Sequence, residues 1–180
     1  MVRELVERIR QKDQRAMNQL YKMYIEELSS VCYRYVPSKN DAKDVLQNSL
    51  VKIFTAIPAL DYRNEESLRA WMIKVVVNEA LSFLRKRKKL LFIEQDPVAI
   101  QISDDDEPQA EKISSDELHR LISELPDGYR TVINLYVFEG YTHKKIAAML
   151  GITESTSASQ LYYAKRELAK RINELIDSKR

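Results

Sequence analysis

Residues 141–168 read YTHKKIAAMLGITESTSASQLYYAKREL, and they contain the clearest structural signal in the chain. Thr142 can cap a short helix whose apolar residues face inward, and Gly151 can supply a left-handed turn at its end. Thr153 then stands where it can cap a second, longer helix. Two helices joined by a short turn that contains glycine are typical of a helix-turn-helix.

The two sides of this second helix differ in character. With about 100° between successive residues, one side collects Ser157, Leu161, Ala164, Leu168 and Leu175. The opposite side carries hydroxyls and cations, which are suited to base edges and phosphates in the major groove. We therefore expect this motif to bind DNA, although an ordinary helical hairpin with a solvated face is the alternative. The expected contacts are Thr142, His143, Lys144, Thr153, Ser155, Thr156, Ser159, Gln160, Tyr162, Tyr163 and Arg166.

Helical patterns extend over most of the remaining chain. Only three glycines and five prolines occur in 180 residues, which leaves little material for tight hairpin turns. The sequence therefore predicts an all-α fold. The first expected helix ends near Gln11, the second spans Asp13–Val36, the third runs from an Asn40 cap to Pro58, and the fourth spans Ser67–Lys89. A fifth helix begins with a capping box formed by Ser114 and Glu117. The last three helices are expected over Tyr129–Glu139, Thr142–Leu150 and Thr153–Ile176.

Residues 92–113 differ from the segments on either side. They show no sustained period, and they contain two prolines and the acidic run DDDE at 104–107. Such a composition is typical of a flexible linker. We therefore expect two small helical domains, residues 1–91 and 114–180, joined by a flexible acidic linker over 92–113, with the helix-turn-helix in the C-terminal domain.

The helix expected at 67–89 carries a polar stripe among apolar residues. Ser67, Lys74, Asn78, Ser82 and Arg85 fall within an arc of about 80°, with Trp71 inside the same arc, and Lys86 continues the stripe into a basic run. Cations, amides, hydroxyls and one aromatic ring suit backbone phosphates and exposed bases. The stripe is therefore a second candidate DNA-binding surface. For Trp71 alone, a core position is the alternative.

The helix before it presents a different surface. Opposite its apolar stripe lie carboxylates and amides around one apolar side chain, Val51. Val51 could be an ordinary exposed valine, but its polar surroundings favour a partner-protein surface. The candidate residues are Asp41, Asp44, Gln47, Asn48 and Val51.

Several classes of protein are disfavoured by what the chain contains. Cys32 is the single cysteine, which fits a reducing compartment, and the charged N-terminus does not resemble a signal peptide. No apolar run approaches the roughly 20 residues that a membrane span needs, so we expect a cytoplasmic protein without membrane insertion. His119 and His143 are the only histidines, and we find neither a glycine-rich phosphate loop nor a metal-ligand cluster. We therefore expect no enzyme activity, cofactor, metal or small-molecule substrate.

Taken together, these segments resemble the extracytoplasmic-function (ECF) sigma factors, which are the smallest sigma subunits of bacterial RNA polymerase. DAKDVLQNSLVKIF at 41–54 is similar to the family's polymerase-binding helix. LRAWMIKVVVNEALSFLRKRKK at 68–89 is similar to its helix for opening and reading the −10 promoter element. LPDGYRTVINLYVFEGYTHKKIAAMLGIT at 125–153 is similar to its −35-reading domain. The order of the three, with an acidic linker between them, is highly specific.

The resemblance implies a set of partners. The residues around Val51 would meet the clamp helices of the polymerase β′ subunit, and the core enzyme, including its β subunit, would be a partner together with promoter DNA and an anti-sigma factor. The loop Leu60–Ser67 would hold a flipped-out base, with Asp61, Tyr62, Arg63 and Asn64 as candidates. The linker would thread toward the active-centre cleft.

Two features depart from the family pattern. The loop Leu60–Ser67 is longer than expected for the family, and Ala158, Gln160 and Tyr163 stand where family members often carry basic residues.

The competing hypothesis is a stand-alone helix-turn-helix regulator with an N-terminal effector domain, which would bind its promoter tightly without polymerase.

Overall fold

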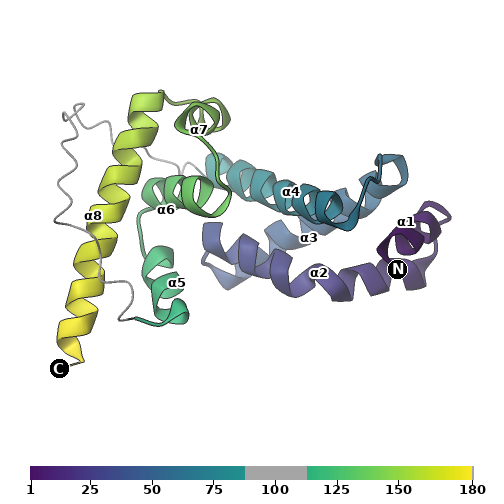
Figure 1. The fold of residues 1–180 in the computed structure, drawn as a ribbon, viewed down its shortest axis with the longest axis horizontal. Coiled ribbons are helices and arrows are strands. Elements are labelled where there is room, and N and C mark those ends of the chain that lie inside the picture. Colours follow the sequence, from purple (N-terminus) through teal and green to yellow (C-terminus); the bar gives the residue numbers. More distant parts are fainter. Residues whose placement is uncertain (88–112, 180) are drawn as a thin grey trace. The chain divides into compact units, whose positions relative to one another are not determined.

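The computed structural model describes residues 1–87 and 113–179, and this part of the chain is helical with no β-strand (Figure 1). The chain divides into two compact units, Met1–Lys86 and Arg87–Arg180. Each unit has its own apolar core. The all-α expectation is therefore confirmed. The expected linker at 92–113 lies, apart from its last residue, outside the described residues, so the boundaries of the linker and of the two domains stay a prediction.

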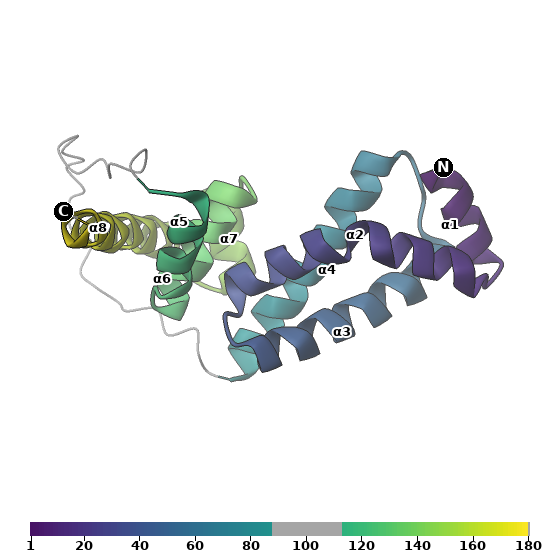
Figure 2. The same cartoon turned by 90° about the horizontal axis from the view of Figure 1, so that it is seen from below.

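The first unit is built from helices that pack side by side. Its elements are α1 (Val2–Arg10), α2 (Gln14–Tyr35), α3 (Lys39–Ala56), the short 3-10 turn η1 (Ile57–Ala59) and α4 (Glu65–Lys86). Helices α2, α3 and α4 contact one another, whereas α1 packs against α2 and η1 (Figure 2). The core consists of the residues that recur at three- and four-residue spacing on the facing sides, including Leu20, Leu28, Val45, Ile53, Val76, Leu81 and Leu84.

Side-chain caps define where the helices of this unit begin. Asp13 caps α2, because its Oδ1 accepts the backbone N–H of Arg15 at 2.8 Å. The expectation that Asn40 caps the third helix is wrong. Ser38 is the N-cap of α3, since its backbone is extended and its Oγ lies 3.5 Å from the backbone nitrogen of Asp41. Asn40 is one residue inside the helix.

Helix α4 also begins earlier than its apolar pattern suggests. The Oδ1 of Asn64 accepts the backbone N–H of Ser67 at 2.8 Å, so the helix begins at Glu65 and Ser67 lies in its first turn. Its buried residues, including Leu68, Met72 and Val76, occupy one side. The opposite side is exposed, where the sequence places the polar stripe.

The second unit is organised around its longest helix. It contains α5 (Ser115–Ser123), α6 (Asp127–Ile133), a π-helical turn η4 (Asn134–Phe138), α7 (His143–Leu150) and α8 (Glu154–Ser178). Helices α5, α6 and α7 all contact α8 (Figure 1). The core between them includes Leu121, Ile122, Leu125, Val132, Leu135, Ile146, Leu161 and Ile172.

The turn η4 corrects the single helix that was expected over Tyr129–Glu139. Helix α6 ends at Ile133, and the backbone then widens, so that the N–H of Glu139 donates to the carbonyl of Asn134 at 3.1 Å. A π turn holds more residues per turn than the 3.6 of an α-helix, which changes the direction in which the following side chains point. Tyr136, Val137 and Phe138 are exposed.

A buried arginine fixes the corner between α5 and α6. Arg130 is only 4% exposed. Its Nη1 donates to the carbonyls of Ser123 at 3.2 Å and Leu125 at 2.6 Å, and its Nη2 pairs with Asp127. A buried charge is tolerated when it is paired and hydrogen-bonded in this way. Arg130 therefore holds the last turn of α5 against the first turn of α6.

Candidate functional site

The helix-turn-helix is formed as its sequence predicts. The Oγ1 of Thr142 accepts the backbone N–H of Lys145 at 3.3 Å and caps α7. Gly151 ends that helix with φ +70°, a left-handed conformation that strains residues with a Cβ atom. The Oγ1 of Thr153 then accepts the N–H of Thr156 at 3.0 Å and caps α8. Both threonine hydroxyls thus hold helix N-termini, and both residues remain exposed.

The outward face of α8 combines hydroxyls, rings and cations. Ser155 and Arg166 are exposed, and the half-buried residues of the face are Thr156, Ser159, Tyr162 and Tyr163. The Arg166 guanidinium lies over the Tyr162 ring, 5.8 Å from its centroid, which favours one orientation of both groups.

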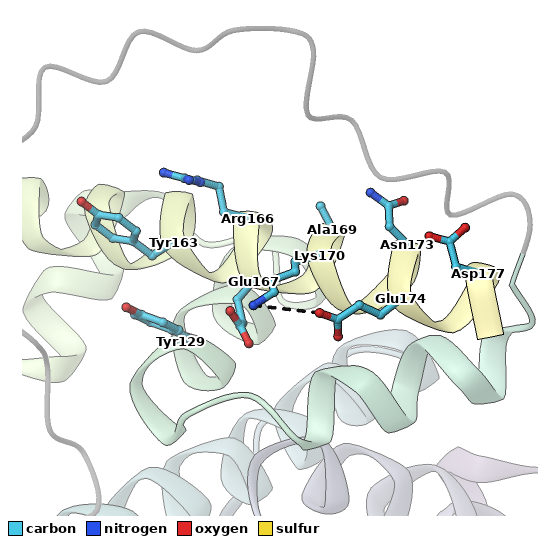
Figure 3. A pocket seen from close by; sticks show the side chains of 9 residues that line it. All are labelled: Tyr129, Tyr163, Arg166, Glu167, Ala169, Lys170, Asn173, Glu174 and Asp177. Carbon is cyan, nitrogen blue, oxygen red and sulfur yellow. Dashed lines mark ion pairs between the residues drawn. The ribbon is translucent and has the colours of Figure 1, made fainter.

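Tyr163 has a second aromatic neighbour. Its ring stacks on that of Tyr129 in α6 at 6.4 Å between centroids (Figure 3). Desolvation raises the pKa of Tyr129, with a smaller contribution from Tyr163, so this hydroxyl stays protonated near neutral pH. One face of Tyr163 is therefore engaged within the protein.

Gln160 is not on this outward face. It is 1% exposed, so it cannot reach a base edge from its present position, and its assignment as a DNA contact is wrong. The reason is its spacing of three residues from Ser157 and four from Ala164, both of which are buried on the inward side.

His143 joins the two helices of the motif. Its Nδ1 lies 3.0 Å from the Oγ of Ser157, which is fully buried on α8, and its ring stacks on Tyr136 at 4.7 Å between centroids. Partial burial lowers the pKa of His143, although Glu154 opposes this effect, and the ring is therefore mainly neutral near pH 7. Lys144, the next residue, is exposed.

A hollow of about 680 Å³ lies beside the C-terminal half of α8 (Figure 3). Its lining contains both signs of charge. Arg166 and Lys170 alternate with Glu167, Glu174 and Asp177, and the Lys170 Nζ lies 3.9 Å from the Glu174 Oε1. Because carboxylates accompany the cations, this hollow does not have the charge pattern of a phosphate-binding site.

The candidate protein-binding face of α3 is exposed as a unit. Asp44, Gln47, Asn48 and Val51 are exposed and Asp41 is half-buried, opposite the buried residues of the helix. Val51 is 62% exposed, which makes it the most exposed large hydrophobic side chain after Met1 among the described residues. A protruding apolar side chain within a polar rim is the arrangement found at the centre of many interfaces.

The polar stripe of α4 is likewise on the surface. Ser67, Lys74, Asn78, Arg85 and Lys86 are exposed, and Trp71 is half-buried. Trp71 is therefore not a fully buried core residue. The stripe lies opposite the side of α4 that packs on α2 and α3.

Two residues missed by the sequence analysis contact the loop before α4. Arg10 donates from Nη2 to the carbonyl of Leu60 at 2.7 Å, and the Arg3 guanidinium lies over the Tyr62 ring at 5.6 Å. Tyr62 is half-buried, whereas Asp61, Arg63 and Asn64 are exposed. No sequence pattern links α1 to a loop 50 residues further on, so only the structure reveals these contacts.

Residues 1–87 and 113–179 carry neither of two other features. No set of three or more His, Cys, Asp or Glu side chains in this part of the chain converges as metal ligands would. None of its helices combines the length and apolar character that crossing a bilayer requires.

Comparison with protein families places both units. A family model of sigma-70 region 2 matches residues 20–90, and a model of sigma-70 region 4 matches residues 115–168. The first match covers most of α2 together with α3 and α4, and the second runs from α5 through the helix-turn-helix to the middle of α8. The two regions, in this order on one chain, define a sigma factor.

Comparison with individual proteins narrows this class. The chain is 30% identical to the ECF RNA polymerase sigma-E factor of Haemophilus influenzae over 96% of its own length and 95% of the relative's. It is also 30% identical to the RNA polymerase sigma factor SigV of Bacillus subtilis, over 74% and 77% of the two chains. The chain belongs to the ECF sigma factors, and it therefore directs promoter-specific initiation of transcription by RNA polymerase. The match to region 2 argues against an unrelated effector domain at the N-terminus.

Two solved structures have a similar fold. One is the sigma factor RpoE of Bartonella quintana in complex with the anti-sigma factor NepR, with a TM-score of 0.51, 22% identity and coverage of 87% of this chain and 96% of that one. The other is CnrH in complex with the cytosolic domain of CnrY, with a TM-score of 0.50, 20% identity and coverage of 96% and 97%.

Proposed function

We propose that three exposed faces divide the work of this sigma factor. The face of α3 around Val51 binds the β′ clamp helices of the core enzyme. The stripe of α4, together with the loop at 60–64, binds and helps to open the −10 element. The outward face of α8 binds the −35 element. The observation that carries the proposal is the exposed polar stripe of α4, which lies inside the region 2 match and opposite a well-packed core.

The chemistry of each face supports its assignment. Lys74, Arg85 and Lys86 supply cations for phosphates, while Asn78 and the half-buried Trp71 can meet exposed bases. On α8, Ser155 and Arg166 reach outward from a helix of the length and position that reads a major groove. These groups bind nucleic acid without bond-breaking chemistry, so the proposed mechanism is positioning and strand separation rather than catalysis.

The wider setting of the protein follows from these assignments. Residues 1–91 would form the polymerase-binding and −10-reading domain, 92–113 a linker, and 114–180 the −35-reading domain. The RpoE and CnrH structures contain NepR and CnrY respectively, and we propose that an anti-sigma factor binds this chain as well. The site of action would be the cytoplasm, where bacterial RNA polymerase transcribes.

The decisive experiment is reconstitution with purified core RNA polymerase. We expect a promoter-specific transcript when the full chain is added, and little promoter binding by the chain without polymerase. A chain that bound its promoter tightly on its own, and gave no transcript with core enzyme, would contradict the proposal and favour a stand-alone regulator.

A further inference from the structure

Helix α1 is firmly attached to the first unit by its apolar side. Val2, Leu5, Val6 and Ile9 are all buried, and the helix packs against α2 and η1. Arg3 and Arg10 lie outside this buried side and are exposed. Because the apolar side anchors the helix, groups on its outer side are held at defined positions relative to η1 and the loop that follows it.

The loop at 60–64 is contacted by two of these outer groups. Arg10 donates to the backbone carbonyl of Leu60 at 2.7 Å, and a second interaction, with Glu7 at 2.8 Å, orients the same guanidinium. Arg3 covers the ring of Tyr62 at 5.6 Å. One contact fixes the backbone where the loop leaves η1, and the other fixes a side chain at its middle.

The far end of the loop is fixed by different groups. Asn64 caps α4 through its side chain, and Glu65 accepts a hydrogen bond from the hydroxyl of Tyr24 at 3.2 Å. Burial, assisted by the charge of Glu65, raises the pKa of Tyr24 to about 12, so the hydroxyl keeps its proton near neutral pH. Tyr24 is itself buried on α2. Between these supports, Asp61 and Arg63 remain exposed.

We propose that α1 is a positioning element for the −10-reading loop, acting through Arg10 and Arg3. This inference rests on the proposed function of the loop. A loop that is held in its binding conformation loses less conformational freedom when a base enters it, and so binds that base more tightly. Arg10 and Arg3 would therefore increase the ratio between the affinity for a strand that carries the promoter base and the affinity for a strand that lacks it. They would do so without contacting the base.

The test uses holoenzyme assembled from the full chain and core polymerase. A −10 sequence is first selected from a randomised DNA pool, and an abasic site is moved through its non-template strand to find the position whose base matters most. Affinities for the intact and abasic strands are then compared for the wild type, Arg10→Gln, Arg10→Lys and Arg3→Ala. Arg15→Gln serves as the control, because it removes the same positive charge from an exposed arginine at the start of α2.

The expected result is selective loss. Arg10→Gln should lower the ratio of intact to abasic affinity by about fivefold, as expected for one hydrogen bond. Arg10→Lys should restore part of it, because lysine also donates to a carbonyl. Arg3→Ala should lower the ratio, and Arg15→Gln should leave it unchanged. Circular dichroism should show the same helix content in every variant.

Three other outcomes would contradict these statements in different ways. If the wild type has no abasic-sensitive position, the proposed function of the loop fails. If the wild type discriminates and Arg10→Gln discriminates equally well, the positioning role of α1 is wrong. If Arg10→Gln weakens binding of both strands to the same extent, Arg10 contacts DNA phosphates directly, and the positioning role is again wrong.

Discussion

Replacing Val51 with Asp would test the polymerase-binding face most directly. The side chain is 62% exposed, so little packing is lost on substitution, and the free energy of unfolding should change by no more than about 0.5 kcal/mol. Binding should respond far more. Covering the exposed part of a valine contributes roughly 1 kcal/mol, and leaving a carboxylate without a partner at the edge of an interface costs roughly 2 kcal/mol more.

A total loss of about 3 kcal/mol corresponds to roughly a 100-fold weaker complex with core polymerase. Titration of labelled variant protein with core enzyme measures this affinity, and thermal unfolding followed by circular dichroism checks the fold. Met23→Asp is a matched control, because Met23 is an apolar residue on α2 that is 40% exposed. If Val51→Asp retained wild-type affinity, or if Met23→Asp weakened the complex equally, the face of α3 would not be the polymerase contact.

Three more predictions concern the other faces and the packing of the second unit. Lys74→Ala, Asn78→Ala and Arg85→Ala should each reduce promoter melting, measured by permanganate reactivity, more than polymerase binding; normal melting would make the stripe merely structural. The isolated domain 114–180 should bind −35 DNA weakly, with log affinity falling by about 0.9 per neutralised phosphate against log salt, and a slope of many phosphates would mean that cationic contacts were undercounted. The interaction with Lys179 and, to a smaller extent, the capping hydrogen bonds with Ser114 lower the pKa of the Glu117 carboxyl from 4.5 to about 2. The charged carboxyl therefore stabilises the fold fully above pH 4.5, and this stabilisation is lost as the pH falls toward 2. Glu117→Gln should therefore lower the melting temperature at pH 7, and the difference from wild type should shrink over that window; a difference unchanged at pH 2 would exclude the ion pair as its cause.

Local sequence signals predicted the helix-turn-helix well, because each depends on one residue and its immediate neighbours. Thr142, Gly151 and Thr153 cap or end their helices through hydrogen bonds and φ values that the residue type itself favours. The exposed faces of α3 and α4 were also foreseen, since the apolar stripe of a helix shows which side is buried. What those faces bind stays a prediction.

The errors arose where local signals compete or where the contact is distant. Gln160 sits at the edge of the buried arc of α8, and a polar side chain there gives no warning that packing encloses it. The π turn after Ile133 keeps a helical residue composition, so periodicity alone cannot distinguish it from a continuing α-helix. The contact from Arg10 to Leu60 depends on how two distant segments pack, which is information that no local pattern contains.

The polar contacts of the second unit also bear on how quickly it folds. Arg130 binds groups within seven residues of itself, and Thr142 and Thr153 cap their own helices. The ion pair between Lys179 and Glu117, at 2.6 Å, instead joins the residue that follows α8 to the first turn of α5. Contacts between near neighbours close small loops at little entropic cost, and helical domains dominated by them fold within microseconds to milliseconds. We therefore expect the α5–α6 corner and the helix-turn-helix to form early, and the pairing of α5 with the end of α8 to form last. If that pairing opened, the unit would close again without having to refold its helix-turn-helix.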